Sequence, residues 1–76
     1  MMYQGLLKID EINPDTINIK IAWEFMIIGS SVFIPCINTN KAKNQLRKIF
    51  KNRGWSAEIR VRIENGIFGV RIWRIL

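Results

Sequence analysis

The sequence has no histidine and only one cysteine, Cys36, among its 76 residues. Without histidine, imidazole acid–base catalysis and histidine-ligated metal sites are excluded. A single cysteine cannot form an internal disulfide or a zinc cluster, and it is typical of a protein from a reducing compartment. We therefore predict no metal, no cofactor and no catalytic residue, which means that the protein is not an enzyme.

Sequence signals for phosphate loops, secretion and membrane spans are also missing. No glycine-rich loop ends in Gly-Lys, and the first residues lack the basic start and apolar block of a secretory signal. The longest apolar run, residues 21–37, is interrupted by Glu24 and Pro35 and falls short of the ~20 residues that span a bilayer. The sequence thus predicts a cytoplasmic protein that does not contact membranes.

Acidic residues are scarce, since six of them stand against twelve lysines and arginines, for a net charge of +6. The imbalance lies in the second half of the chain. Residues 41–76 hold ten basic and two acidic residues, whereas residues 1–40 hold two basic and four acidic ones. A basic half of this kind favours a polyanion or an acidic protein surface as the partner.

The chain is long enough for one domain, which we place over residues 1–76. Residues 1–16 are an N-terminal segment that forms either a short strand or a loop. Residues 17–21 alternate isoleucine with polar residues, a pattern typical of a half-buried strand. Residues 31–37 form a second strand, in which Pro35 marks a sheet edge or the end of regular pairing.

A helix is predicted over residues 41–53. Thr39 or Asn40 is positioned to cap its start, and Gly54 suits the left-handed residue that follows a helix. The apolar residues of this segment recur at i, i+4, i+7 and i+8 and form one stripe: Ala42, Leu46, Ile49 and Phe50. No acidic residue occurs in the segment, so its basic residues have no partner of opposite charge one turn away: Lys41, Lys43, Arg47, Lys48 and Lys51.

Asn65-Gly66 between two alternating stretches predicts a β-hairpin with a two-residue turn. This turn sets the register, and a shift by one residue would destroy the match of apolar residues on one face. The apolar pairs in this register are Ile59/Ile72, Val61/Val70 and Ile63/Phe68. We expect this face to meet the apolar stripe of the helix and to form the core.

The opposite face of the hairpin carries the charges. Arg60 lies directly opposite Arg71, an arrangement that destabilises a sheet, and Glu58 and Glu64 relieve part of the repulsion diagonally. Trp73 offers a stacking surface beside the arginines. The helix and this face together predict a binding site for nucleic acid or an acidic partner: Lys43, Arg47, Lys48, Lys51, Arg60, Arg62, Arg71 and Trp73.

The predicted fold is α+β, with a single amphipathic helix packed on an antiparallel sheet of three or four strands. The order along the chain is strand, strand, helix, strand, strand, and the last two strands form the hairpin at Asn65-Gly66. Gly69, opposite Arg62, leaves a gap in the surface for the close approach of a ligand or for sheet twist.

The stretch "GSSVFIPC", a basic helix and then "NGIFGVRIWRI" resemble a family of short proteins of bacteriophages and their hosts. The family pattern is G-x-S, two hydrophobic residues, V-P, a Lys/Arg-rich helix and a closing G-V-R-V-W-R. The resemblance covers residues 23–75 and implies a location in the cytoplasm of a bacterial host, but no activity is attached to the family. It depends on Gly29, Ser31, Pro35, Gly69, Arg71, Trp73 and Arg74.

The order strand, helix, strand, with Arg60 and Arg62 in "IRVRI", is also similar to a small phage inhibitor of bacterial RNA polymerase. Three hypotheses follow for this small basic protein. The first is a phage-type protein that binds nucleic acid, namely DNA, without catalysis. The alternative is a host-takeover inhibitor that binds an acidic surface of a bacterial protein such as RNA polymerase. The third is a homo-oligomeric structural module that pairs through an exposed strand.

Overall fold

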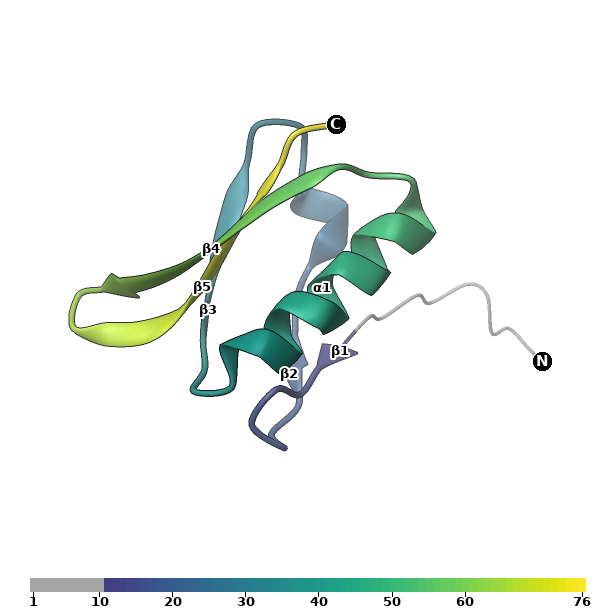
Figure 1. Ribbon diagram of the computed structural model, residues 1–76. Helices are drawn as coiled ribbons and strands as arrows, with labels where there is room; N and C mark the ends of the chain where they lie inside the picture. The colour runs from purple at the N-terminus through teal and green to yellow at the C-terminus, as the bar shows by residue number, and fades with distance from the viewer. Residues whose placement is uncertain (1–10) are drawn as a thin grey trace.

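A computed structural model describes residues 11–76 as a helix packed on one face of a three-stranded sheet, with a two-stranded hairpin beside the helix (Figure 1). β1 (Glu11–Ile12) pairs with β2 (Ile19–Lys20), and the short helix η2 (Trp23–Phe25) follows. The rest consists of β3 (Ser31–Pro35), α1 (Thr39–Arg53), β4 (Ala57–Glu64) and β5 (Ile67–Arg74). The main sheet has the order β3-β5-β4, and all pairs are antiparallel. The predicted α+β fold and element order are confirmed.

The N-terminal part differs from the prediction in the length of its strand. Only Ile19 and Lys20 of residues 17–21 form a strand, and the side chain of Ile17 is 71% exposed. The turn that joins β1 to β2 takes up the preceding residues, including Thr16 with a positive φ of 69°. Residues 1–10 of the predicted N-terminal segment lie outside the described residues.

The C-terminal hairpin has the register that the Asn65-Gly66 turn predicts. Both turn residues have positive φ angles, 52° and 78°, as a type I′ turn requires. All eight predicted or flanking pairs are observed, from Ala57 opposite Arg74 to Glu64 opposite Ile67. The hairpin register is therefore confirmed.

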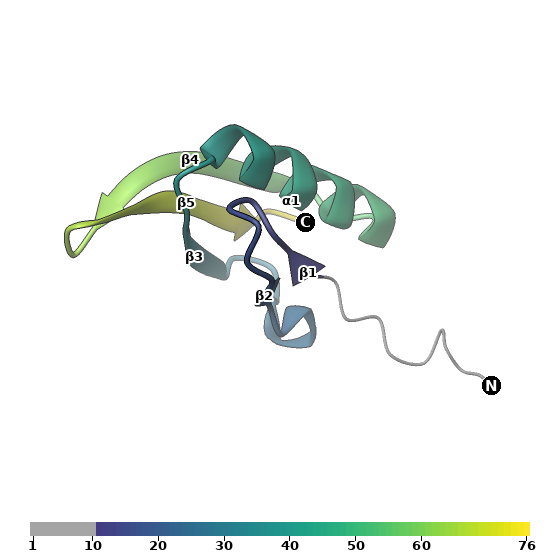
Figure 2. The same ribbon diagram turned by 90° about the horizontal axis from the view of Figure 1, so that it is seen from below.

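The apolar face of this hairpin is buried only in part, which corrects the prediction that all three apolar pairs form the core. Val70 and Ile72 are fully buried beneath α1, whereas Val61, Ile63 and Phe68 are 42%, 69% and 44% exposed. The tip of the hairpin extends past the helix (Figure 2), and these side chains are only partly covered. The buried core consists of Ile12, Trp23, Met26, Ile34, Cys36, Ala42, Leu46, Ile49, Phe50, Val70 and Ile72.

The helix begins earlier than predicted and has a different cap. Asn38 is the N-cap, and its side chain accepts a hydrogen bond of 3.1 Å from the backbone N–H of Lys41. The carboxylate of Asp15 accepts hydrogen bonds from the N–H groups of Ile37, at 2.7 Å, and Asn38, at 2.8 Å. These long-range contacts fix the backbone just before Thr39, so the helix starts there. Its end at a left-handed Gly54 (φ 72°) is as predicted.

Gly69 is required by the close approach of β3 to β5. It lies opposite Pro35, and a Cβ atom at this position would clash with the carbonyl oxygen of Ile34 and come within 2.9 Å of the Cα atom of Pro35. The close approach of β3 therefore accounts for the glycine opposite Arg62. Pro35 ends β3, which is an edge strand, as the sequence predicts.

We predict that Gly69→Ala lowers the free energy of unfolding by about 1–3 kcal/mol, because backbone atoms of β3 must move to admit the methyl group. Urea unfolding followed by tryptophan fluorescence measures this change. Gly66→Asn is the matched control, since asparagine tolerates a positive φ and no atom lies within 4 Å of an added Cβ there. Equal stability of Gly69→Ala and the wild type would contradict the packing described.

Candidate nucleic-acid interface

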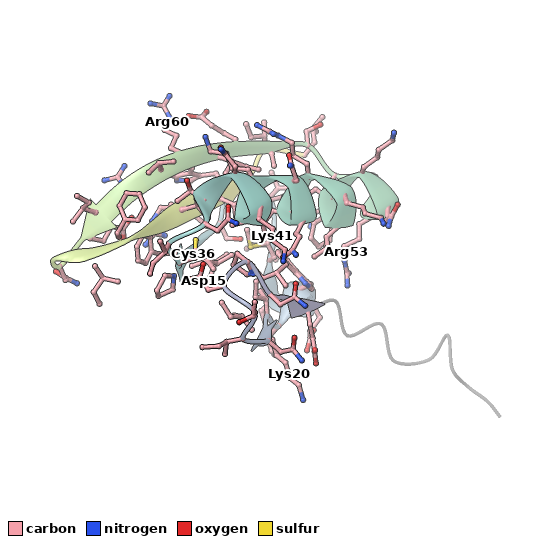
Figure 3. All side chains as sticks on the ribbon, turned by 60° about the horizontal axis from the view of Figure 1, so that its bottom comes forward. Asp15, Lys20, Cys36, Lys41, Arg53 and Arg60 are labelled. Carbon is pink, nitrogen blue, oxygen red and sulfur yellow. The ribbon has the colours of Figure 1, made fainter. Side chains whose placement is uncertain are left out.

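The eight predicted site residues fall on two different surfaces of the molecule. Lys43, Arg47, Lys48 and Lys51 lie on α1, which covers the core face of the sheet. Arg60, Arg62, Arg71 and Trp73 lie on the other face, which we term the outer face, and Figure 3 shows Arg60 projecting from β4 away from the helix. The helix set and the outer-face set therefore lie on opposite sides of the sheet.

Arg71 is held in place on the outer face by its own chain. Its Nε and Nη2 atoms donate to the two carboxylate oxygens of Glu64, at 2.6 and 2.7 Å, and its Nη1 atom donates to Ser31 Oγ at 2.7 Å. Gly69 lies between Arg71 and the turn on this face, so no side chain blocks the path to Glu64. The guanidinium also lies over the ring of Phe33, 5.8 Å from its centroid. Arg71 thus links all three strands.

The other two outer-face arginines also have acidic neighbours on β4. Arg60 Nε donates to Glu58 at 2.5 Å, and Arg62 Nε lies 3.1 Å from Glu64 Oε2. Arg62 further lies over Trp73, 5.9 Å from the ring centroid. Two carboxylates therefore stand against three guanidinium groups. Glu64 reaches Arg71 across the hairpin, as predicted, whereas Glu58 pairs with Arg60 along the same strand.

The ion pair between Glu64 and Arg71 changes the proton affinity of both groups. The hydrogen bonds from Arg71 lower the pKa of Glu64 below its ordinary value of 4.5, although partial burial opposes this. The same hydrogen bonds raise the pKa of Arg71, so it stays charged. At neutral pH the pair is fully ionised.

The helix carries cations without such compensation. We term its five outward cations, Lys41, Lys43, Arg47, Lys48 and Lys51, the basic helix face. No acidic residue lies within α1, and no ion pair is recorded for any of these five with the described acidic residues. Asp15 binds the backbone at the start of the helix, and Glu11 lies 4.0 Å from Lys20. The uncompensated charge of the described chain is thus concentrated on α1.

A shallow hollow of about 400 Å³ separates α1 from the first part of β4. Arg47 and Lys51 line it from the helix, together with apolar and aromatic side chains: Phe50, Trp55, Ala57 and Ile59. The ring of Trp55 is already engaged, because the guanidinium of Arg74 lies 3.9 Å from its centroid and Phe50 meets it edge to face at 5.3 Å. The hollow therefore offers cations and apolar surface, but no open ring for base stacking.

The residues that carry the family resemblance are engaged in the fold itself. Arg74, which the site prediction leaves out, donates to the carbonyl oxygens of Met26 and Leu76 at 2.8 and 2.9 Å. The N–H of Gly29, at φ 90°, donates to the carbonyl of Arg74 at 2.8 Å. Ser31, Pro35, Gly69 and Arg71 hold the three strands together, as described above. The arginines of β5 thus form hydrogen bonds within the fold. The sequence pattern alone does not distinguish such structural arginines from those of a binding site.

Comparison with known proteins identifies no counterpart: no protein-family model, curated protein or solved structure matches the chain. Within residues 11–76, no helix is long and apolar enough to cross a membrane. The same part of the chain contains no group of three or more cysteine or carboxylate side chains that is arranged to hold a metal ion.

We predict that Glu64→Gln destabilises the protein at neutral pH and that the difference from the wild type disappears in acid. A carboxylate whose pKa is lowered by folding stabilises the native state above its ordinary pKa of 4.5, and this contribution is lost as the pH falls through the lowered value. Urea unfolding at a series of pH values between neutral and acid measures the difference. Glu58→Gln, which removes a single exposed ion pair, is the matched control with a smaller effect. A destabilisation that is the same at every pH would contradict the ion-pair assignment.

Proposed function

We propose that the protein binds nucleic acid non-enzymatically, through contacts of the basic helix face with the phosphate backbone. The observation that carries the proposal is the contrast between the two basic surfaces. Arginines of the outer face pair with Glu58 and Glu64, whereas the basic helix face has no acidic partner among the described residues. Like charges that repel one another along a helix reduce its stability, so an external anion is the natural source of compensation.

The spacing of the helical cations suits a charged backbone. Lys43, Arg47 and Lys51 are four residues apart, so successive members lie about 6 Å apart along the helix axis and on neighbouring turns of the same side. Lys48 precedes Lys51 by three residues and is therefore its neighbour on the preceding turn of the helix. A rigid row of cations releases the counterions that are condensed on a nucleic acid, and this release supplies most of the affinity of sequence-independent binding.

The aromatic residues favour recognition of the backbone over recognition of bases. Trp55 lies against Arg74 and Phe50, and Trp73 lies beside Arg62. Proteins that bind single strands stack bases on open aromatic rings. Because the ring of Trp55 is occupied within the chain and Trp73 lies on the outer face, away from the basic helix face, double-stranded DNA with little sequence preference is the ligand that we propose.

The alternative function, a host-takeover inhibitor that docks on an acidic bacterial protein, would use the outer face. That face has less net charge to offer, because Glu58 and Glu64 already pair with its three arginines. The basic helix face therefore favours nucleic acid. Capture of partners from a nuclease-treated bacterial lysate separates the two functions, since a protein partner that survives nuclease would support the inhibitor.

We predict that binding to duplex DNA weakens steeply with salt. About four phosphate contacts give a slope of log K against log salt near −3.6, which corresponds to a loss of about 100-fold between 50 and 200 mM salt. Removing two contacts with Arg47→Gln/Lys51→Gln reduces the slope by about 1.8. Fluorescence anisotropy with a labelled duplex measures both, and duplex RNA of the same sequence tests the choice of DNA.

Two control variants separate local contacts from net charge. Arg47→Lys/Lys51→Arg keeps both charges and is expected to keep the salt slope. Asn18→Asp/Lys20→Gln lowers the net charge by the same two units on the β1–β2 hairpin and is expected to leave the slope nearly unchanged. A titration that is flat in salt would contradict the proposal, as would a larger loss from Arg60→Gln than from the helix variant.

A further inference from the structure

β4 is a long strand at an open edge of the main sheet. It pairs with β5 over all eight residues without a bulge, and no described strand lies on its other side. The opposite edge, β3, has five residues and ends at Pro35, which lacks a backbone donor. Natural proteins protect sheet edges with short strands, bulges, proline or charged side chains. β3 is short and ends at proline, whereas β4 is long and regular and carries only charged side chains, of both signs, which can pair with those of a second β4.

The backbone of β4 shows which of its residues face this edge. The carbonyl of Phe68 accepts a hydrogen bond from the N–H of Cys36, and the N–H of Arg74 donates to the carbonyl of Ser30. The backbone N–H and C=O groups of the even-numbered residues of β5 therefore point toward β3. The backbone groups of its odd-numbered residues point toward β4, where they pair with the even-numbered residues of β4. The odd residues therefore direct their N–H and C=O groups outward: Ala57, Ile59, Val61 and Ile63.

We propose that β4 pairs with β4 of a second copy of the chain, antiparallel and about a two-fold axis that passes beside Arg60. In this register Glu58 lies opposite the partner's Arg62, and by symmetry Arg62 lies opposite the partner's Glu58. Ion pairs of this kind stabilise neighbouring strands. This inference does not depend on the proposed function, because it rests on the backbone and the side chains of β4 and not on the binding of nucleic acid by the basic helix face.

The charges of β4 and the length of the contact together select this register over its neighbours. Moving the axis to Val61 would place Glu58 opposite Glu64 and Arg60 opposite Arg62, both like-charged pairs. Moving it to Ile59 would pair Glu58 with Arg60, and moving it to Arg62 would pair Arg60 with Glu64, but each of these would keep only five residues of β4 in contact, against seven for the axis at Arg60. A shift by one residue would set outward backbone groups against inward ones and apolar side chains against charged ones.

The apolar side of β4 is self-complementary in the same register. Ile63 and Val61 are exposed near the tip of the hairpin, while the hollow beside α1 lies next to Ala57 and Ile59. The axis at Arg60 places the partner's Ile63 opposite Ala57 and the partner's Val61 opposite Ile59. Two exposed side chains of each copy thus enter the hollow of the other, where Phe50 and Trp55 form further apolar surface.

Symmetry closes this assembly at two copies. The two-fold contact covers the free edge of β4 in both copies, so no β4 edge remains open to add a third copy. Arg60 lies next to the partner's Arg60 at the axis, and the ion pair of each with its own Glu58 offsets their repulsion. Both α1 helices then lie on the same face of a six-stranded sheet.

Sedimentation velocity of the nuclease-treated protein at micromolar concentration tests the inference, with a dimer as the expected result. Glu58→Arg and Arg62→Glu each turn two attractive pairs into repulsive ones and are expected to weaken the dimer about tenfold or more. The double variant Glu58→Arg/Arg62→Glu restores the opposite charges and is expected to recover the dimer. Glu24→Arg, which makes the same charge change on the exposed surface of η2, is expected to leave it unchanged.

Cross-linking tests the register itself. With the axis at Arg60, Arg60→Cys brings two thiols together at a non-hydrogen-bonded pair, where Cα atoms are about 4.5 Å apart and a disulfide forms under mild oxidation. Ile59→Cys, Val61→Cys and Arg62→Cys report the competing registers and are expected to cross-link poorly, and the native Cys36 is buried. A monomer at all concentrations tested would overturn the proposal, and so would a dimer insensitive to Glu58→Arg or preferential cross-linking at 59, 61 or 62.

Discussion

The antiparallel pairing of β5 with a strand on each side is the constraint on which the rest of the structure depends. Because β5 is central, its residues alternate strictly between two environments. Val70 and Ile72 face α1 and are fully buried, whereas Arg71 faces outward and bonds to Glu64 and Ser31 from the two neighbouring strands. The close approach of β3 at Gly69 fixes this arrangement in register. A change at β5 therefore affects the core and the charged face together.

The same constraint explains why basic residues on the two sides of the sheet have different roles. On the outer face, residues of adjacent strands lie close enough for Glu58 and Glu64 to pair with arginines, and these contacts are part of the fold. On α1, the core-facing stripe uses the residues that turn inward, and the helix itself contains no carboxylate. Clustered positive charge thus has two different roles, because the arginines of β5 stabilise the sheet while the basic helix face forms no ion pair with the described acidic residues.

Local sequence patterns predict the parts of this fold that depend on local interactions. The Asn65-Gly66 turn fixes the hairpin register residue by residue, and the stripe of Ala42, Leu46, Ile49 and Phe50 identifies the buried side of the helix. What the patterns miss depends on long-range contacts. Asp15 sets the start of the helix from 22 residues away, and the position of α1 on the sheet decides that Val70 is buried while Val61 is not.

The candidate site is predictable to a similar degree and for the same reason. Composition and helix periodicity are enough to locate the cations of α1, because outward positions on a helix follow from its own sequence. The separation of the helix from the outer-face arginines is a tertiary property, since it requires knowledge of which face of the hairpin the helix covers. The bond from Arg74 to Met26 joins residues 48 apart in the chain and has no local signature.

The exposed apolar residues of the hairpin matter because the chain is small. A chain of this length buries only about 60% of the surface of its unfolded state, so its core contributes little beyond what folding requires. Val61, Ile63 and Phe68 are 42%, 69% and 44% exposed, so part of their apolar surface remains available for burial. The backbone edge of β4, the strand that carries Val61 and Ile63, is open along its length, and Glu58 and Arg62 give this strand charges of both signs. Apolar surface, unpaired backbone and self-complementary charge coincide on one strand, and a protein that gains stability by association places them together in this way.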